Sequence, residues 1–255
     1  MIAGQTVLAV FAHPDDESLA CGGTIARLAD AGARVIVVCA SHGERGSHAG
    51  PVRDDSLGRT RAGEVRAAAQ TLGVAELILL NHPDGDLRWC EVPELHAELV
   101  MLMRHHAPAA VITFGEDGLY WHVDHIAIHE RTTDAVRALG DEAPPLYYVT
   151  MPLGVMPQIV NSAKALGWTP PPKGFWSLEP NAFGLHAAQP TIVVDVADWV
   201  PRKIAALLSH ESQMVEGHPF ARINAQDARR WLGVEHFHRA LTPSSRNALL
   251  EGLCT

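Results

Sequence analysis

The chain has no cluster of basic side chains and no long apolar run. Its formal net charge is -9, and because phosphate binding needs clustered Lys and Arg, we expect no nucleic-acid partner. No apolar stretch approaches the roughly 20 residues that a membrane span requires. The N-terminus also lacks the charged region and cleavage site of a signal peptide, so we expect neither a membrane span nor export.

Cysteine is scarce and scattered. The four cysteines are Cys21, Cys39, Cys90 and Cys254, and no two of them form a CxxC pair. This spacing indicates neither a disulfide framework nor a thiolate zinc site. Free thiols suit a reducing compartment, which predicts a cytoplasmic location.

The glycine-rich turn of dinucleotide-binding proteins is also missing. That turn, Gly-x-Gly-x-x-Gly, directly follows the first strand, whereas this chain has His-Pro-Asp-Asp-Glu at the same place. Gly22 and Gly23 come later, inside a predicted helix. Binding of NAD, FAD or S-adenosylmethionine is therefore not expected.

What the chain does contain is an alternation of strands and helices. With 255 residues, 47% of them hydrophobic, it is able to bury a sizeable core. The predicted strands lie at 6–12, 33–40, 76–80, 109–114 and 191–196, and the predicted helices at 18–30, 58–72, 92–106 and 198–216. This order predicts an α/β, Rossmann-like fold, a mostly parallel sheet with helices on both faces. No domain boundary is evident, so we expect residues 1–255 to form one domain.

Polar loops follow the predicted strands. They cover residues 13–17, 41–48, 81–86 and 115–122. Since the carboxyl ends of parallel strands meet at one edge of the sheet, and ligand sites lie there, we expect these loops to open on a single site.

Three consecutive acids stand in the first of these loops. Pro14 cannot continue a central strand, so the chain turns there. Three adjacent carboxylates repel one another unless a cation or strong donors lie among them. Asp15 or Asp16 could instead cap the following helix, but capping leaves His13 and two acids unexplained.

A second polar motif begins the helix that follows residue 121. His122 and His125 are three residues apart, with His129 one turn further on, so they share a helix face. A lone histidine there would be a packed or solvated residue. Together with His13 and Asp16, however, the pair provides the two histidines and one carboxylate typical of a catalytic zinc that keeps a position open for water. Iron and manganese remain alternatives, because such sites accept several divalent metals.

The two motifs resemble those of the LmbE-like or PIG-L family of zinc-dependent N-deacetylases, which are AHPDDE and HPDH. This chain has Ala12-His-Pro-Asp-Asp-Glu17 and His122-Val-Asp-His125. The first motif is complete, whereas the second has Val123 where the family has proline. Because proline at that place stiffens the start of the helix and supplies no ligand, we expect an intact metal site.

The resemblance implies a role for each matching residue. It places one Zn²⁺ per chain on His13, Asp16 and His125. It makes Asp15 the general base that takes a proton from the attacking water. Further matches within about the first 140 residues imply substrate-binding roles for Glu44, Arg61 and Asp84.

Three residues of the second motif region complete the implied active site. Tyr120 is expected to help stabilise the oxyanion. His122 is expected to be protonated and to assist the leaving amine, with Asp124 orienting its ring.

The sequence from residue 141 onward supports fewer predictions. Residues 141–190 are rich in proline and aromatic side chains, which predicts either a lid or substrate-specificity insertion, or a surface loop packed by its own aromatics. His210 lies in a stretch, 203–213, that resembles a late helix of the family. We assign it to a solvated helix face, with an approach to the site as the alternative. The last forty residues indicate no site.

The resemblance implies a hydrolase that removes the N-acetyl group from a small conjugate containing N-acetylglucosamine. One alternative is an inactive sugar- or metal-binding protein on the same scaffold, and another is an amidase acting on a glucosamine-thiol conjugate. A base and a proton donor around an open metal favour the enzyme. The sequence does not identify the aglycone, and a homo-oligomer stays possible.

Overall fold

A central sheet organises the computed structural model, which describes residues 2–46, 48, 56–89, 92–171, 175–214, 219–221, 223–240 and 249–254. Within these residues the sheet has seven strands in the order β3-β2-β1-β4-β5-β7-β6. The strands are β1 (Thr6–Phe11), β2 (Arg34–Cys39), β3 (Glu76–Leu79), β4 (Ala110–Phe114), β5 (Leu146–Thr150), β6 (Ile192–Asp195) and β7 (Val234–Arg239). The first five run parallel, β7 pairs antiparallel with β5, and β6 pairs antiparallel with β7. The predicted mostly parallel sheet is confirmed.

Strand β1 lies in the middle of the parallel part, between β2 and β4. Every residue from Val7 to Phe11 is fully buried, which explains why its apolar run shows no alternation. The run ends at Ala12, and the polar loop that begins with His13 follows at the carboxyl end. The sheet thus places the first motif at the edge where ligand sites of this architecture lie.

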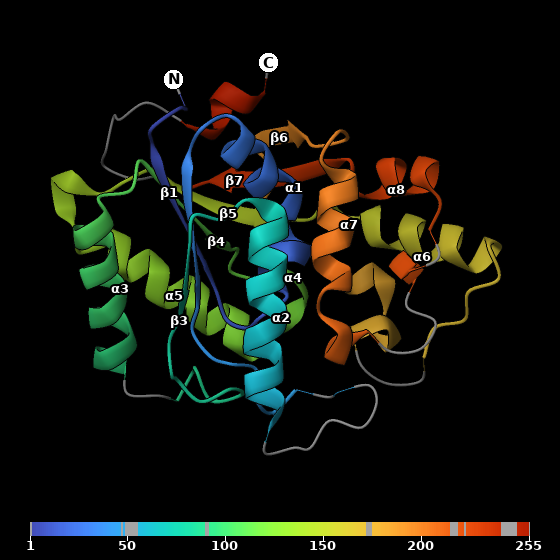
Figure 1. The fold of residues 1–255 in the computed structure, drawn as a ribbon, viewed down its shortest axis with the longest axis horizontal. Coiled ribbons are helices and arrows are strands. Elements are labelled where there is room, and N and C mark those ends of the chain that lie inside the picture. The colour runs from blue at the N-terminus through green and yellow to red at the C-terminus, as the bar shows by residue number, and fades with distance from the viewer. Residues whose placement is uncertain are drawn as a thin grey trace.

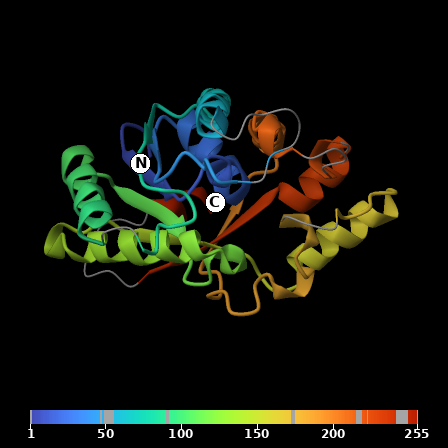
Figure 2. The same ribbon diagram turned by 90° about the horizontal axis from the view of Figure 1, so that it is seen from below.

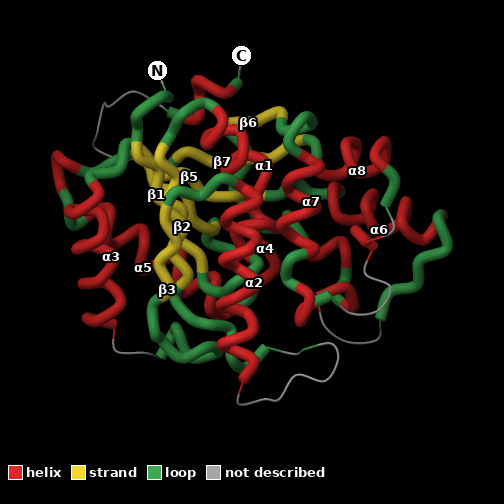
Figure 3. The backbone as a smooth tube through the Cα atoms, in the orientation of Figure 1, coloured by secondary structure: helices red, strands yellow, loops and turns green. Residues whose placement is uncertain are grey.

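Helices cover both faces of the sheet, as Figures 1 and 2 show. One layer contains α1 (Asp16–Asp30), α2 (Leu57–Leu72) and α7 (Val200–Leu208), and the other contains α3 (Val92–His106) and α5 (Val123–Arg137). The short α4 (Gly118–Trp121) leads into α5, while α6 (Val155–Ala165) and α8 (Ala225–Leu232) lie beside the antiparallel end of the sheet. Figure 3 shows the strands in the centre and loops gathered at one end of them. Among the described residues, no helix has the length and apolar character needed to cross a membrane.

Helix α1 is broken near its middle. Cys21 has φ -150° and ψ 29°, outside the helical region, so the backbone N–H groups after the break need other partners. The backbone N–H groups of Gly23 and Thr24 donate to the carboxylate of Glu235 at 2.9 and 2.7 Å. Lys203 Nζ lies 2.6 Å from the same carboxylate. Two late segments of the chain therefore hold the second half of α1.

Glycine is required at the break because the backbone is crowded there. A Cβ atom on Gly23 would lie 2.6 Å from Cγ2 of Val196, closer than packed carbon atoms approach one another. This packing explains a Gly-Gly pair inside a helix, which the sequence pattern alone did not.

Two predictions for the later chain need correction. Part of the predicted lid, residues 146–150, is strand β5 in the interior of the sheet, paired with β4 and β7. The predicted helix 198–216 is shorter: α7 covers Val200–Leu208, and a 3₁₀ turn at Glu211–Gln213 follows. Residues 215–218, like Cys90, lie outside the described part of the chain.

The hydrophobic core has two parts. The larger surrounds the sheet, and the smaller joins α6, α7 and α8 to the loop that carries Trp176 and Phe183. This smaller cluster explains the aromatic content of the region predicted as a lid, because its aromatics pack against helices rather than only against one another.

Candidate metal centre and active site

Asp16 lies at the centre of the candidate site, at the first turn of α1. Its Oδ2 accepts the backbone N–H of His13 at 2.8 Å, which closes the turn after β1. Burial alone would raise the pKa of this carboxyl, but the facing rings of His125 and His13 hold it well below its usual range. Asp16 is therefore a buried carboxylate with histidines on two sides.

His125 points its Nε2 toward that carboxylate. Its Nδ1 donates to the carbonyl of Gly118 at 3.1 Å, which leaves Nε2 as the lone-pair atom. Nε2 lies 3.2 Å from Asp16 Oδ1 and has no hydrogen-bond partner among the described residues. The ring is held by stacking on Phe114, with centroids 3.9 Å apart.

The ring of His13 is also oriented by contacts of one of its nitrogens. Its Nε2 hydrogen-bonds Oδ2 of Asp124 at 3.1 Å and lies 3.1 Å from Oδ1 of Asp84. Since these carboxylates fix a proton on Nε2, Nδ1 is the nitrogen that is able to take a metal ion or a second proton, and it lies 3.4 Å from Asp16 Oδ2. Carboxylates behind a ligating histidine are common at metal sites, where they set the tautomer.

This donor set fits a divalent metal. Two imidazole lone pairs face one carboxylate, and the ring nitrogens of His13, His122 and His125 lie within 4.8 Å of one another. Although burial opposes it, the carboxylates of Asp124, Asp16 and Asp84 raise the pKa of His13 well above its usual value. Without a metal, these carboxylates thus favour a protonated, positively charged His13. The same surroundings would suit a metal cation. Two histidines and one carboxylate are residue types that bind divalent metal ions.

Asp15 points away from this cluster. It has the left-handed φ of 101°, so its side chain diverges from that of Asp16 and stays 29% exposed. Burial raises the pKa of Asp15, and the Arg61 guanidinium, 3.3 Å from its Oδ2, opposes that rise. Asp15 is the N-cap residue of α1, yet its side chain makes no cap hydrogen bond. The capping alternative is therefore wrong for Asp15.

Tyr120 and His122 lie across the site from the acids. Burial, together with Asp16 and Asp15, raises the pKa of Tyr120, so its phenol stays protonated. Burial and the neighbouring His125 and His13 lower the pKa of His122 to about 4. This environment favours a neutral ring over the protonated His122 that the resemblance implies, and the role of His122 in the reaction stays a prediction.

The expected contact between Asp124 and His122 is made by different atoms. The backbone N–H of Asp124 donates to Nδ1 of His122 at 3.3 Å, so the remaining proton of the neutral ring is on Nε2. The Asp124 carboxylate instead accepts from His13 and from the backbone of Gly85 and Leu87. It orients the predicted metal ligand, while only its main chain orients His122.

Comparison with known proteins agrees with this geometry. The family model PIG-L, described as GlcNAc-PI de-N-acetylase, matches residues 8–136. A 1D-myo-inositol 2-acetamido-2-deoxy-alpha-D-glucopyranoside deacetylase from Thermobispora bispora is 34% identical, over 97% of this chain and 92% of its own length. The chain belongs to the PIG-L family. A protein of the same description from Mycolicibacterium smegmatis is 32% identical, over 91% of this chain and 88% of its own.

Solved structures share the fold of this PIG-L family member. The N,N'-diacetylchitobiose deacetylase from Pyrococcus horikoshii has a TM-score of 0.63 and 24% identity, covering 92% of this chain and 84% of its own. GalB, the 4-carboxy-2-hydroxymuconate hydratase from Pseudomonas putida, has a TM-score of 0.64 and 20% identity, covering 96% and 99%. Since one neighbour is a hydratase, the fold alone does not specify deacetylation.

The three residues expected to bind substrate differ in their placement. Arg61 and Asp84 line the cavity in front of the acids, although both are buried and have protein partners. Glu44 is not among the described residues that line it. Its Oε1 accepts the backbone N–H of Asp84 at 2.9 Å, so its contact supports the loop that carries Asp84.

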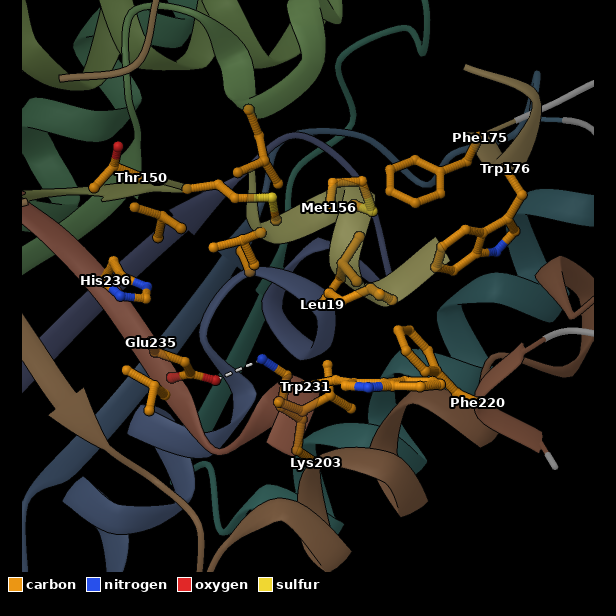
Figure 4. A pocket seen from close by; sticks show the side chains of 18 residues that line it. Leu19, Thr150, Met156, Phe175, Trp176, Lys203, Phe220, Trp231, Glu235 and His236 are labelled. Carbon is orange, nitrogen blue, oxygen red and sulfur yellow. Dashed lines mark hydrogen bonds and ion pairs between the residues drawn. The ribbon is translucent and has the colours of Figure 1, made fainter. Parts of the chain in front are cut away.

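The cavity in front of Asp15 has a volume of about 680 Å³. Catalytic-loop residues form one wall, and Pro171 and Phe175 to Leu178 form another together with Leu207, Gln213, Met214 and Phe220. A role of this second wall as a lid stays a prediction. A smaller, mostly apolar cavity of about 70 Å³ lies behind Leu19, Phe175, Trp176 and Phe220, and its far end holds the Lys203–Glu235 pair (Figure 4).

His210 is not on a solvated helix face, so that assignment is wrong. The residue is fully buried, and its Nε2 lies 3.0 Å from Oε1 of Glu17. The alternative, an approach to the site, is what the structure shows. His210 follows the end of α7, where the turn carries its ring to the start of α1.

Proposed function

We propose that this protein is a metal-dependent hydrolase that removes the acetyl group from N-acetylglucosamine linked to a small polar alcohol such as myo-inositol. The observation that carries the proposal is the division between neighbouring acids. Asp16 faces two histidines, while Asp15 faces the cavity. The curated relatives, which are deacetylases of N-acetylglucosaminyl-inositol by their descriptions, support the substrate class.

His13, Asp16 and His125 would hold the metal. A divalent ion there supplies Lewis acidity toward the amide carbonyl and lowers the pKa of water to about 7 when the ion is zinc. The Asp84 and Asp124 carboxylates hold a proton on His13 Nε2, so Nδ1 would be the metal-binding atom, and the Gly118 carbonyl holds a proton on His125 Nδ1, so Nε2 would bind the metal.

Asp15 acts as the general base. Its carboxylate borders the cavity, and only one of its oxygens lies near Arg61, at 3.3 Å. The second oxygen is placed to accept a proton from the attacking water. Once the amide nitrogen becomes the leaving group, the same carboxyl is able to return that proton to the amine.

Tyr120 and His122 act as hydrogen-bond donors to the developing oxyanion. Tyr120 keeps its phenolic proton because its pKa is raised, and neutral His122 carries its proton on Nε2, opposite the Asp124 amide. Donors that face a developing negative charge in a buried site lower the barrier substantially. A protein that only binds the sugar and does not hydrolyse it would gain no advantage from these donors.

An assay of acetate release would test the function. We expect the zinc-loaded protein to hydrolyse N-acetylglucosaminyl-inositol faster than free N-acetylglucosamine, N,N'-diacetylchitobiose or N-acetylglucosaminyl-malate, because the cavity of about 680 Å³ is in the range that small-molecule sites need. Failure to release acetate from every member of this panel, with binding retained, would instead support the inactive binding protein. Preference for a thiol conjugate would favour the amidase.

The wall at Trp176 should control selectivity. Its ring packs on Trp168 and Phe175, with centroids 5.5 and 4.9 Å apart, and borders both cavities. Trp176→Ala should change the ratio of kcat/KM between the inositol and malate conjugates by about 10-fold, which is the discrimination that roughly one well-packed apolar contact supplies. Hydrolysis of free N-acetylglucosamine should be nearly unaffected. Leu178→Ala, on the same wall but 40% exposed, is the control. An equal loss on all substrates would mean that Trp176 only supports the fold.

A further inference from the structure

Glu17, the third acid of the first motif, has no role in the mechanism above, yet it is fully buried. Both of its carboxylate oxygens are occupied. Oε2 accepts the backbone N–H of Asp15 at 3.0 Å, and Oε1 accepts from Ser18 Oγ at 2.6 Å and from His210 Nε2 at 3.0 Å. Burying a carboxylate is costly unless its oxygens accept hydrogen bonds such as these.

Within the described part of the chain, the His210 ring makes no other hydrogen bond that would explain its burial. Its Nδ1 is without a hydrogen-bond partner among the described residues, so its single hydrogen bond there goes to Glu17. The partners are 193 residues apart in sequence. The turn after α7 therefore brings a donor to the start of α1 and leaves it facing one carboxylate.

Asp15 needs support of this kind because its backbone is strained. Its φ of 101° is in the left-handed region, which side chains with a Cβ rarely adopt. The peptide group between Pro14 and Asp15 is held at both ends. Arg61 Nη2 donates to the Pro14 carbonyl at 2.6 Å, and the Asp15 N–H donates to Glu17. With that peptide plane fixed, the Asp15 carboxylate faces the cavity while Asp16 faces the histidines.

We infer that Glu17 and His210 are positioning residues that hold the general base through the peptide group before Asp15; the inference rests on the function proposed above. His210 orients the Glu17 carboxylate, and Glu17 orients the Asp15 N–H. Neither residue touches substrate or metal. Their effect on the reaction is exerted through the direction of the Asp15 side chain.

Replacing His210 by phenylalanine should test this, since the change keeps ring volume and removes the donor to Glu17. We expect kcat to fall about 10- to 100-fold, the size of effect that a small misplacement of a reacting group produces. KM and metal content should change by less than about twofold. His210→Gln, which keeps a donor, should recover part of the lost kcat.

A double variant separates positioning from general damage. In the Asp15→Asn protein the base is already lost, so adding His210→Phe should lower the residual rate by less than about twofold. Glu235→Gln is the matched control, because Glu235 is also a buried carboxylate that accepts N–H groups of α1, but beyond the break. It should lower Tm and leave kcat nearly unchanged.

Two activity results would overturn the inference. One is an equal loss from His210→Phe in the wild-type and Asp15→Asn proteins, and the other is an equal loss of kcat from Glu235→Gln. A crystal structure of His210→Phe provides a measurement independent of activity. The Asp15 φ should leave the left-handed region or the carboxylate should turn from the cavity, and an unchanged Asp15 would refute the inference even if the proposed substrate class were wrong. If His210→Phe fails to fold, His210→Gln takes its place in each comparison.

Discussion

Asparagine in place of Asp15 should lower kcat about 10²- to 10⁴-fold, the usual cost of removing a general base, while the protein keeps its metal. The change removes one charge and almost no volume, and Asp15 is not among the residues that face the two histidines. KM should change far less than kcat, because the lost interaction belongs to proton transfer. Acetate release with metal analysis on the same sample measures both effects.

The control for this variant is Asp86→Asn. Asp86 lies in the neighbouring loop, its side chain is 42% exposed and pairs with Arg45, and such solvent-accessible pairs contribute little. This variant should hydrolyse the substrate at close to the wild-type rate. If Asp15→Asn did the same, the base would have to be another residue, and the mechanism proposed here would be wrong.

The region around the first motif could be predicted from sequence because its signals are local. Continuous apolar residues in β1 indicate a buried parallel strand, and His13 to Glu17 stand directly at its end. The parallel-sheet rule then brings the loops with Asp84 and His122 to the same edge, and the distances around His13 agree with that expectation.

Strands β5 and β7 could not be predicted in the same way. Leu146–Thr150 follows two prolines and stands in a proline-rich region, where a loop was the simpler interpretation. β7 is mixed in polarity, and its position depends on pairing with β5 and β6, which are distant in sequence. Tertiary pairing, more than local propensity, decides such strands.

The hydrogen-bond partners of charged residues could not be predicted from the sequence either. The hydrogen-bond partner of His210 is Glu17, near the other end of the chain. The sequence pattern around residue 210 therefore does not predict this contact. The proton positions on His122 and His13 depend on the Asp124 main chain and on two carboxylates from different loops. Residue types predict which groups meet at a site, whereas tautomers follow only from the folded contacts.

Loss of His125 should abolish metal binding. The wild-type protein should contain about one divalent ion per chain, and His125→Ala close to none, because His125 Nε2 is buried, faces Asp16 and has no hydrogen-bond partner among the described residues. Asp16→Asn should weaken binding, since it removes the charge shared by both histidines. Elemental analysis after dialysis against limiting zinc measures the content.

His129→Ala provides the matched control for this loss. His129 lies one turn beyond His125 on α5, and its Nδ1 donates to the Phe114 carbonyl at 3.0 Å, away from Asp16. This variant should keep the metal. Because a ligand stabilises the folded state by mass action, zinc at about 100 times its Kd should stabilise wild type and His129→Ala by about 2.7 kcal/mol, with no such gain for His125→Ala. Full loading of His125→Ala, or equal metal loss in His129→Ala, would remove His125 from the metal site.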